Sequence, residues 1–144
     1  MGLYDLIRIL TIWHICHKMK GEIDISYSVV LYEKDNGEKP VKTFIFQSDA
    51  KMQAKIIGLL EVLEEKGNLL REPYSKHLED GISELRCQVG NNITRILYFF
   101  YYQKQIVLTN GFVKKTQKTP RREIELAKHR KNEYIKRMER YDDI

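Results

Sequence analysis

The sequence has few cysteines and no long hydrophobic run. Its two cysteines, Cys16 and Cys87, lie far apart and match neither a disulfide framework nor a paired zinc-ligand pattern. Both thiols fit a reducing compartment. The longest uninterrupted apolar stretch, Ile96 to Tyr102, is far shorter than the roughly 20 residues that a membrane-spanning helix needs. We therefore expect a cytoplasmic protein with no membrane partner.

Several catalytic motifs are also missing. The chain has no Gly-rich phosphate loop and no Gly-flanked nucleophilic serine, so nothing in it supports a kinase, a nucleotide-binding protein or a serine hydrolase. His14, Cys16 and His17 resemble a metal site only superficially, because no second cluster completes the four ligands that zinc favours. We expect these three residues to be structural, and we predict neither a metal nor another cofactor.

What the sequence does contain is enough apolar material for one domain. A chain of 144 residues that is 42% hydrophobic can bury a core without disulfides or a structural metal. We expect a single domain over residues 23–144. Residues 1–22 form an N-terminal extension whose apolar and aromatic side chains are compatible with a packed helix. This extension lacks the basic start and the small-residue cleavage site of a signal peptide, and Met19 is an alternative initiation site.

Positive charge is concentrated near the C-terminus. The whole chain carries a net charge of +5, but the segment from Val113 to Arg140 alone contains 11 Lys or Arg residues against 4 Glu residues. Such clustering is typical of a protein that binds a polyanion, because each neutralised phosphate releases counterions. A solvated basic helix face would give the same pattern, so charge alone leaves both interpretations open.

The first half of this domain is predicted to hold one strand and two helices. Alternating apolar residues indicate a half-buried strand from Ile23 to Glu33, and Asp35-Asn36-Gly37 ends it with a turn. Pro40 favours a helix over Val41 to Gln47, although a strand would also fit. Ser48 is a candidate N-cap for the next helix, which Gly67-Asn68 should end. The apolar stripe of that helix consists of Met52, Ile56, Leu59 and Leu63.

The second half is predicted to hold three strands and a basic helix. Ile82 to Val89, Ile93 to Tyr102 and Gln105 to Val113 are joined by short turns and must form an antiparallel meander. Thr119 and Pro120 indicate the start of the last helix, with Thr119 as its N-cap. Its apolar side consists of Ile124, Ala127, Tyr134, Ile135 and Met138. The expected fold is therefore α+β: an antiparallel sheet covered on one face by the N-terminal helices, with a basic C-terminal helix.

Three segments of the chain carry a resemblance to a known family. They are Leu78 to Arg86 (LEDGISELR), Thr94 to Phe100 (TRILYFF) and Gly111 to Pro120 (GFVKKTQKTP). In this order and at this spacing they resemble the phage-derived, HigB-type toxins of the RelE superfamily, which belong to type II toxin–antitoxin systems. The resemblance covers nearly everything after Ile25.

The resemblance implies a small RelE-like domain with endoribonuclease activity. Such an mRNA interferase needs no metal, cleaves messenger RNA on the translating ribosome, and so inhibits translation and growth. Its implied partners are the ribosome, messenger RNA and a cognate helix-turn-helix antitoxin of the HigA-like type. The family pattern places catalytic cations on Arg86, Arg95, Lys114 and Lys115. Some relatives carry a catalytic tyrosine shortly after the basic pair, where this chain has residues 116–119 (TQKT), so the general acid and base stay open.

The chemistry of these side chains fits metal-free RNA cleavage. The reaction needs the 2′-hydroxyl held in line with its phosphate, cations that stabilise the developing charge, and groups that move protons. Arg86 and Arg95 each offer a planar fork of donors, whereas Lys114 and Lys115 offer mobile point charges. The alternative for Arg86 is a structural salt bridge with Glu84, which shares its strand face.

A second group of residues is predicted to contact RNA. His77, in the loop before the meander, is the best-placed candidate proton carrier, because histidine is the side-chain type that changes its charge near neutral pH, although a loop histidine often has no chemical role. Tyr98, Tyr101 and Tyr102 can stack on bases, although aromatic residues of a central strand usually belong to the core. The full set of predicted RNA contacts is Lys76, His77, Tyr98, Lys118, Arg121 and Arg122.

Two other functions fit the same residues. The basic face can belong to a non-catalytic module that binds nucleic acid or a partner protein, or to an inactive toxin that its antitoxin still holds. Growth arrest on expression without an antitoxin would separate the active enzyme from both. Arg-to-Lys changes would also discriminate, because simple binding tolerates them better than oriented catalysis does.

Overall fold

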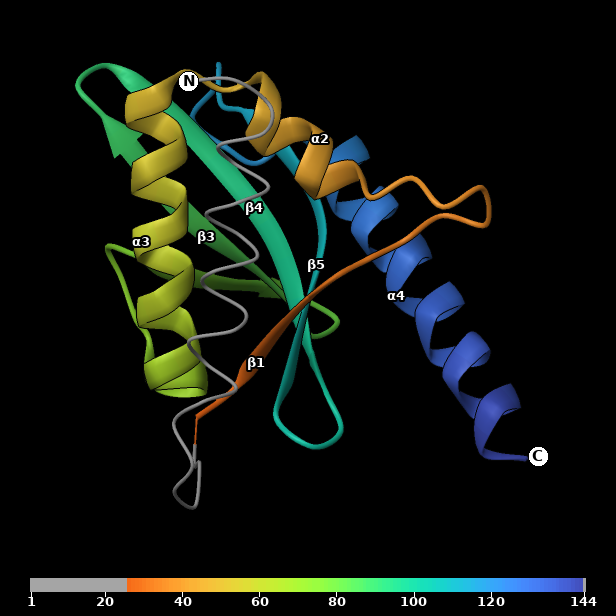
Figure 1. The fold of residues 1–144 in the computed structure, drawn as a ribbon. Helices are drawn as coiled ribbons and strands as arrows, with labels where there is room; N and C mark the ends of the chain where they lie inside the picture. The colour runs from red at the N-terminus through yellow and green to blue at the C-terminus, as the bar shows by residue number, and fades with distance from the viewer. Residues whose placement is uncertain (1–25, 144) are drawn as a thin grey trace.

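A five-stranded sheet and three α-helices make up residues 26–143, the part of the chain that this computed structural model describes (Figure 1). In chain order the elements are β1 (Ser28–Leu31), α2 (Pro40–Gln47), α3 (Ala50–Lys66), the 3₁₀ helix η1 (Gly67–Leu69), β2 (Ser75–Glu79), β3 (Ile82–Val89), β4 (Asn92–Tyr101), β5 (Gln105–Val113) and α4 (Arg121–Asp142). The predicted α+β class is confirmed. None of the described helices is long and apolar enough to cross a membrane. The predictions for residues 1–22, including His14, Cys16 and His17, lie outside the described residues.

The sheet has the order β1-β5-β4-β3-β2. Strands β3, β4 and β5 form the predicted antiparallel meander, and β1 joins β5 in parallel, which makes the sheet mixed. The β4–β5 turn has positive φ at both Gln103 and Lys104, and three residues, 102–104, connect the paired residues Tyr101 and Gln105. The register of the meander, which has one shift between Leu97 and Tyr98 in the β4–β5 pair, fixes which side chains of β3, β4 and β5 share a face.

Strand β2 was not predicted. Lys76 and His77 were expected in a loop, but they lie in an edge strand that pairs antiparallel with β3. The five residues of β2, SKHLE, carry little of the alternating apolar pattern that marks a strand. Pairing with β3 supplies the backbone hydrogen bonds, so the strand depends on a tertiary partner rather than on its own sequence.

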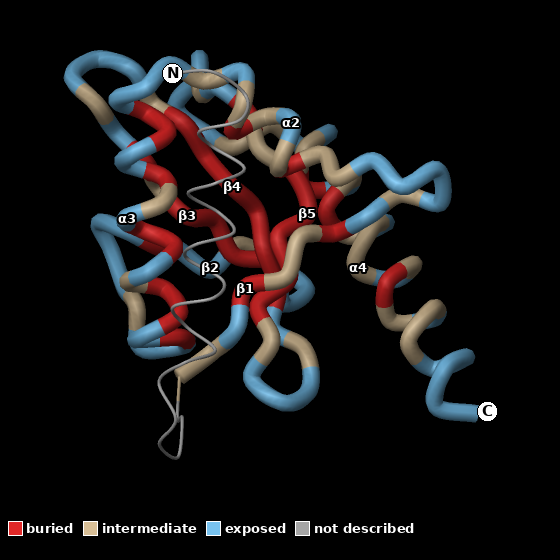
Figure 2. Tube along the Cα trace, viewed as in Figure 1, coloured by how far each residue is buried: buried red, intermediate tan, exposed pale blue. Residues whose placement is uncertain are grey.

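Both faces of the sheet are covered, which corrects the prediction that only one would be. Helices α2 and α3 pack on one face over a core that includes Leu85, Ile96 and Leu108. Helix α4 packs on the opposite face, where Ala127 and Tyr134 contact a second core. In Figure 2 the buried residues, in red, lie along the strands between these two layers of helices. We call these two sides of the sheet the α3 face and the α4 face.

The helix ends partly match the prediction. Helix α2 is confirmed, and Gly67, at φ 54°, ends α3 as expected. The N-cap of α3 is Asp49 rather than Ser48: the Asp49 carboxylate accepts a hydrogen bond of 2.8 Å from the Met52 amide, whereas the Ser48 hydroxyl donates to the Phe44 carbonyl. Thr119 does not cap α4 either, because its hydroxyl is directed at the sheet.

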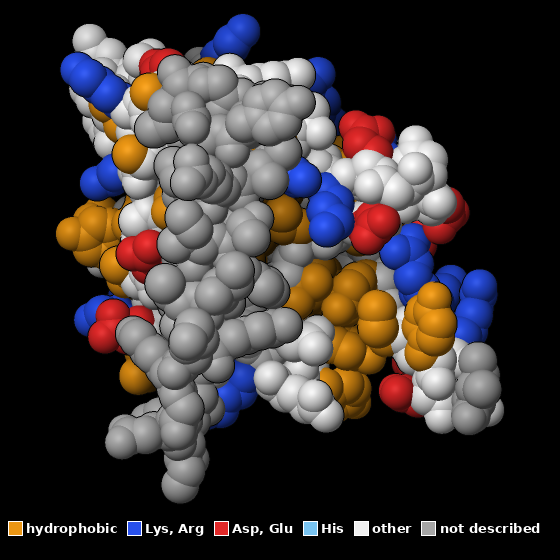
Figure 3. All heavy atoms as spheres, in the orientation of Figure 1, with side chains coloured by type: hydrophobic (Ala, Val, Ile, Leu, Met, Phe, Trp, Pro, Cys, Tyr) orange, Lys and Arg blue, Asp and Glu red, His pale blue; other side chains and the backbone are white. Residues whose placement is uncertain are grey.

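The cations of α4 attach this helix to the rest of the domain. Arg121 and Lys128 both pair with Glu79, at the end of β2. Farther along the helix, Arg137 pairs with Asp35 at 3.0 Å. Hydrophobic side chains gather between α4 and the strands, and Lys and Arg side chains lie along the outer edge of the helix (Figure 3). Part of the basic charge therefore holds the helix in place, and part faces solvent.

The contact between Glu79 and α4 predicts a pH effect on stability. Hydrogen bonds from Arg121 and then Lys128 lower the pKa of Glu79 from 4.5 to about 2. Because the folded-state pKa is the lower one, the contribution of Glu79 to stability is complete above pH 4.5 and is lost as the pH falls towards 2. We expect Glu79→Gln to flatten the acid limb of the stability profile, which is the fall in the free energy of unfolding between pH 4.5 and 2. Urea unfolding curves measured at each pH give this free energy. Glu61→Gln, on an exposed position of α3, is the control, and an unchanged acid limb in Glu79→Gln would contradict the assignment.

Candidate functional site

Strand alternation brings four cations together on the α4 face. Glu84 and Arg86 lie on the same face of β3, because successive strand residues point to opposite sides. Arg95 is paired directly with Arg86 across β3 and β4, and Lys76 is paired with Glu84 across β2 and β3. Lys114 follows the end of β5, where its backbone amide donates to the Ile93 carbonyl. We call Lys76, Arg86, Arg95 and Lys114, with Glu84 among them, the cationic cluster.

Glu84 is the centre of this cluster. Only 3% of its side chain is exposed, and its carboxylate accepts a hydrogen bond of 3.1 Å from the Arg86 Nε. The structural salt bridge with Glu84, the alternative to a functional role for Arg86, is therefore present. The second carboxylate oxygen lies 2.5 Å from the donating Thr119 hydroxyl and 3.8 Å from the Arg95 Nε. One buried carboxylate thus holds two arginines and the segment that leads into α4.

Arg95 is the most deeply buried cation of the cluster. It is 7% exposed, and one terminal nitrogen donates to the Thr94 carbonyl. Its Nε has no hydrogen-bond partner among the described residues, because the 3.8 Å to Glu84 is an ion-pair distance that is too long for a hydrogen bond. Burial lowers the pKa of Arg95, and the nearby Glu84 carboxylate partly opposes this effect. The Arg95 Nε is therefore a buried donor without a hydrogen bond, next to the Glu84 carboxylate in the cluster.

Lys114 experiences the positive field of the whole cluster. Its pKa is lowered first by burial and then by repulsion from Arg95, with further repulsion from Arg86 and Lys76, while Glu84 opposes the shift. Four cations surround one carboxylate, so this end of the sheet carries excess positive charge at short range. Such a site attracts phosphate, and a bound anion would raise the pKa of Lys114 again.

The other predicted cations lie around the cluster or point elsewhere. Lys115 and Lys118 are exposed in the segment between β5 and α4, and Arg122 is exposed in the first turn of α4. Arg121 pairs with Glu79 and Glu125 and does not belong to the cluster. Of the consecutive pair Lys114 and Lys115, Lys114 lies at the cluster and Lys115 is exposed to solvent.

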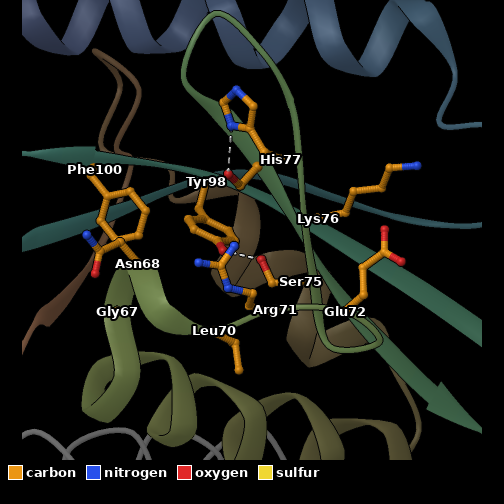
Figure 4. Close-up of a pocket in the computed structure, with 11 residues that line it drawn as sticks. Gly67, Asn68, Leu70, Arg71, Glu72, Ser75, Lys76, His77, Tyr98 and Phe100 are labelled. Carbon is orange, nitrogen blue, oxygen red and sulfur yellow. Dashed lines mark hydrogen bonds between the residues drawn. The ribbon is translucent and has the colours of Figure 1, made fainter.

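His77 and Tyr98 lie on the other side of the sheet from the cluster. His77 is opposite Ser83 on the α3 face, and Tyr98, which is 2% exposed, belongs to the core of that face. Both line a cavity of about 570 Å³ between η1, the segment that follows it and the edge of the sheet (Figure 4). The predicted RNA contacts therefore fall into two places, with Lys76 directed to one face and His77 to the other.

Several residues of these two sites were not identified from the sequence. Glu84 was considered only as a salt-bridge partner of Arg86, although its alternation with Arg86 already placed both on one face. Thr119 was assigned to a helix cap. The cavity residues Arg71, Ser75 and Phe100 carry no motif that indicates a site. Within residues 26–143 no group of His, Cys, Asp and Glu side chains is placed to hold a metal ion.

A comparison with protein families identifies the chain. Residues 43–132 match the family of Gp49-like phage-derived proteins (DUF891). The chain belongs to this family. Gp49-like proteins are associated with RelE-like and HigB-like toxins, and the α+β fold is consistent with a small RelE-like domain. No curated protein matches the sequence. The part of the chain that matches the Gp49-like family includes the whole cationic cluster, the cavity and the first half of α4.

Proposed function

We propose that this Gp49-like protein is the toxin of a type II toxin–antitoxin system, a cytoplasmic HigB-type endoribonuclease that cleaves messenger RNA on the ribosome. The observation that carries the proposal is the cationic cluster, in which Lys76, Arg86, Arg95 and Lys114 surround the buried Glu84. The association of the family with toxins supports it independently. A cluster of this charge fits the phosphate of an RNA backbone.

The proposed reaction is an internal transesterification. The 2′-hydroxyl of one nucleotide gives up its proton to solvent or to a group of the ribosome, and its oxygen attacks the adjacent phosphorus. The bond to the 5′-oxygen of the next nucleotide breaks, that oxygen takes up a proton, and a 2′,3′-cyclic phosphate and a 5′-hydroxyl form. Arg95 stabilises the extra negative charge on the phosphate, because its buried guanidinium is fixed before the substrate arrives. Lys114 is suited to protonate the leaving 5′-oxygen, because its pKa is lowered by burial and by Arg95.

Glu84 has a positioning role in this proposal. Its carboxylate is already hydrogen bonded to Arg86 and Thr119, so it is not available to accept the proton of the 2′-hydroxyl. By holding these two residues it fixes the cluster and the segment from Lys114 to Pro120. The cluster therefore supplies charge stabilisation and an acid, and it lacks a complete acid–base pair of its own.

This incomplete acid–base pair predicts dependence on the ribosome. We expect the purified protein to cleave free RNA poorly and to cleave messenger RNA efficiently on translating ribosomes, which would hold the 2′-hydroxyl in line with the phosphate. Primer extension on messenger RNA with and without ribosomes measures both rates. Efficient, sequence-selective cleavage of naked RNA would contradict the proposal. If the protein cleaves neither free RNA nor messenger RNA on ribosomes, and if its expression does not arrest growth, a non-catalytic binding module is favoured.

The proposed partner is a helix-turn-helix antitoxin of the HigA-like type. Exposed cations at the cluster and along α4, among them Lys115, Lys118 and Arg122, favour an acidic partner surface. Long-range attraction of this kind accelerates association and is weakened by salt. An acidic antitoxin that covers the cluster would exclude RNA and keep the toxin inactive.

A further inference from the structure

The cavity on the α3 face shares only Lys76 with the cationic cluster. Its volume of about 570 Å³ falls within the range of about 300 to 1,000 Å³ that is usual for small-ligand sites. The backbone from Gly67 to Glu72 forms one wall, and strands β2, β3 and β4 form the floor. Because His77 and Lys76 are consecutive residues of β2, the sheet itself lies between the cavity and the cluster.

The floor of the cavity is unusually polar for a core face. The hydroxyls of Ser75 and Tyr98 are 2.5 Å apart, Tyr98 also interacts with the Ser83 hydroxyl, and that hydroxyl lies 3.4 Å from the His77 Nδ1. These four side chains form a connected row. Each hydroxyl both donates and accepts, so the row can adapt its hydrogens to a ligand with either donors or acceptors.

The rim adds a cation and an aromatic ring to these hydroxyls. Arg71 and Phe100 line the same cavity as Ser75 and Tyr98, and Figure 4 shows the Phe100 ring on a different side of the cavity from Arg71. Phe100 is 38% exposed although it follows a fully buried stretch of β4. Glu72 and Lys76 also line the cavity, and in Figure 4 their side chains point to one side of this group. The cations that line the cavity are therefore Arg71 and Lys76.

We propose that this cavity binds one nucleotide, with its base against Phe100, its phosphate on Arg71 and its sugar or base edge on the row of hydroxyls. Aromatic rings stack on bases of any sequence, and a guanidinium binds phosphate through two parallel hydrogen bonds. An apolar ligand would leave the buried hydroxyls and the guanidinium without new partners, which is unfavourable. The Arg71 guanidinium and the row of hydroxyls supply the hydrogen bonds to the nucleotide, so the site needs no glycine-rich loop.

The position of β2 indicates how an RNA strand would reach this site. Strand β2 is the edge of the sheet, and its side chains alternate between the cluster (Lys76) and the cavity (His77). An RNA strand that crosses this edge can place one nucleotide in the cavity while its neighbour lies at the cluster. This continuity rests on the proposed function, whereas nucleotide binding in the cavity does not.

Titration of the full-length protein with adenosine 3′-monophosphate tests the proposal. The probe should shift the NMR signals of the His77 and Tyr98 rings, with the His77 signal identified by its loss in His77→Gln. Arg71→Gln and Phe100→Leu should each raise the Kd tenfold or more. Lys51→Gln, on an exposed position of α3, and Tyr141→Leu, on an exposed position near the end of α4, are the matched controls and should change the Kd less than twofold. Arg71 is exposed, so Arg71→Gln tests the site even if Phe100→Leu is poorly folded.

Two results would overturn the proposal: no shift of the His77 signal at millimolar nucleotide, or equal affinities in Arg71→Gln and the parent protein. A 2′-O-methyl hexanucleotide, which cannot be cleaved, distinguishes the two sources of nucleotide. If RNA is the source, the hexanucleotide binds at least tenfold more tightly than the mononucleotide, and Arg95→Gln weakens the binding of the hexanucleotide only. Equal affinities of the hexanucleotide and the mononucleotide indicate that the natural ligand is a free nucleotide. Mononucleotide binding without ribosomal cleavage would refute the proposed function alone, and cleavage without mononucleotide binding would refute this inference alone.

Discussion

Arg95→Lys should lower the rate of ribosome-dependent cleavage by about 100-fold or more, the loss usual for one preorganised donor to a developing negative charge. The substitution keeps the charge and removes the planar fork. Arg95 is 7% exposed and its neighbours Glu84 and Thr94 fix its position, so a lysine ammonium cannot reproduce its donor geometry. Single-turnover cleavage on ribosomes that carry a defined messenger RNA measures the effect.

The same experiment separates catalysis from simple binding. If the cluster only attracts RNA, its charge alone matters, and the cleavage rate of Arg95→Lys should lie within about threefold of the rate of the parent protein. Arg140→Lys makes the same change at an exposed position near the end of α4 and should leave the rate unchanged. Circular dichroism and thermal unfolding of both variants ensure that lost activity is not lost folding. A folded Arg95→Lys protein with nearly full activity would remove Arg95 from the reaction.

The parts of the fold that the sequence predicted correctly are those with local causes. Strand β3 and strand β5 begin and end where the pattern of apolar residues and turns placed them, because each turn lies next to the strands it joins. Helix α2 follows from Pro40 at its first position. Two helix starts, at Asp49 and at Pro120, differ from the prediction because Ser48 and Thr119 found other partners. The partner of Thr119, Glu84, is 35 residues away in the chain.

The residues of the candidate site also fall into two groups: those that local sequence patterns predict, and those whose placement depends on distant parts of the chain. Arg86 and Glu84 could be placed on one face from alternation alone, and the pairing of Arg95 with Arg86 follows from the hairpin between β3 and β4. The separation of Lys76 from His77 could not be predicted, because it requires that both belong to a strand, and β2 has no strand pattern of its own. The cavity depends on the path of the backbone after α3, where distant segments meet, so no local pattern indicates it.

Glu84→Gln should destabilise the folded protein by about 3 to 5 kcal/mol, the usual effect of removing one partner from a buried ion pair. Glutamine has the same shape and can still accept from Thr119, but it leaves Arg86 and Arg95 without a counter-charge next to each other. Their repulsion is what a bound anion would relieve. Sulfate, which favours burial generally, should therefore stabilise Glu84→Gln more than it stabilises the parent protein.

Urea unfolding with and without sulfate measures both parts of this prediction. Glu65→Gln, on an exposed position of α3, is the control for loss of a negative charge and should change the free energy of unfolding by less than about 0.5 kcal/mol. Thr119→Val tests the second contact of Glu84, and its effect should be smaller in the Glu84→Gln background, because the charge that strengthens this hydrogen bond is gone. If Glu84→Gln is as stable as the parent protein without sulfate, the carboxylate does not hold the cluster together. The four cations would then tolerate one another through solvent screening alone, and the positioning role of Glu84 would have to be abandoned.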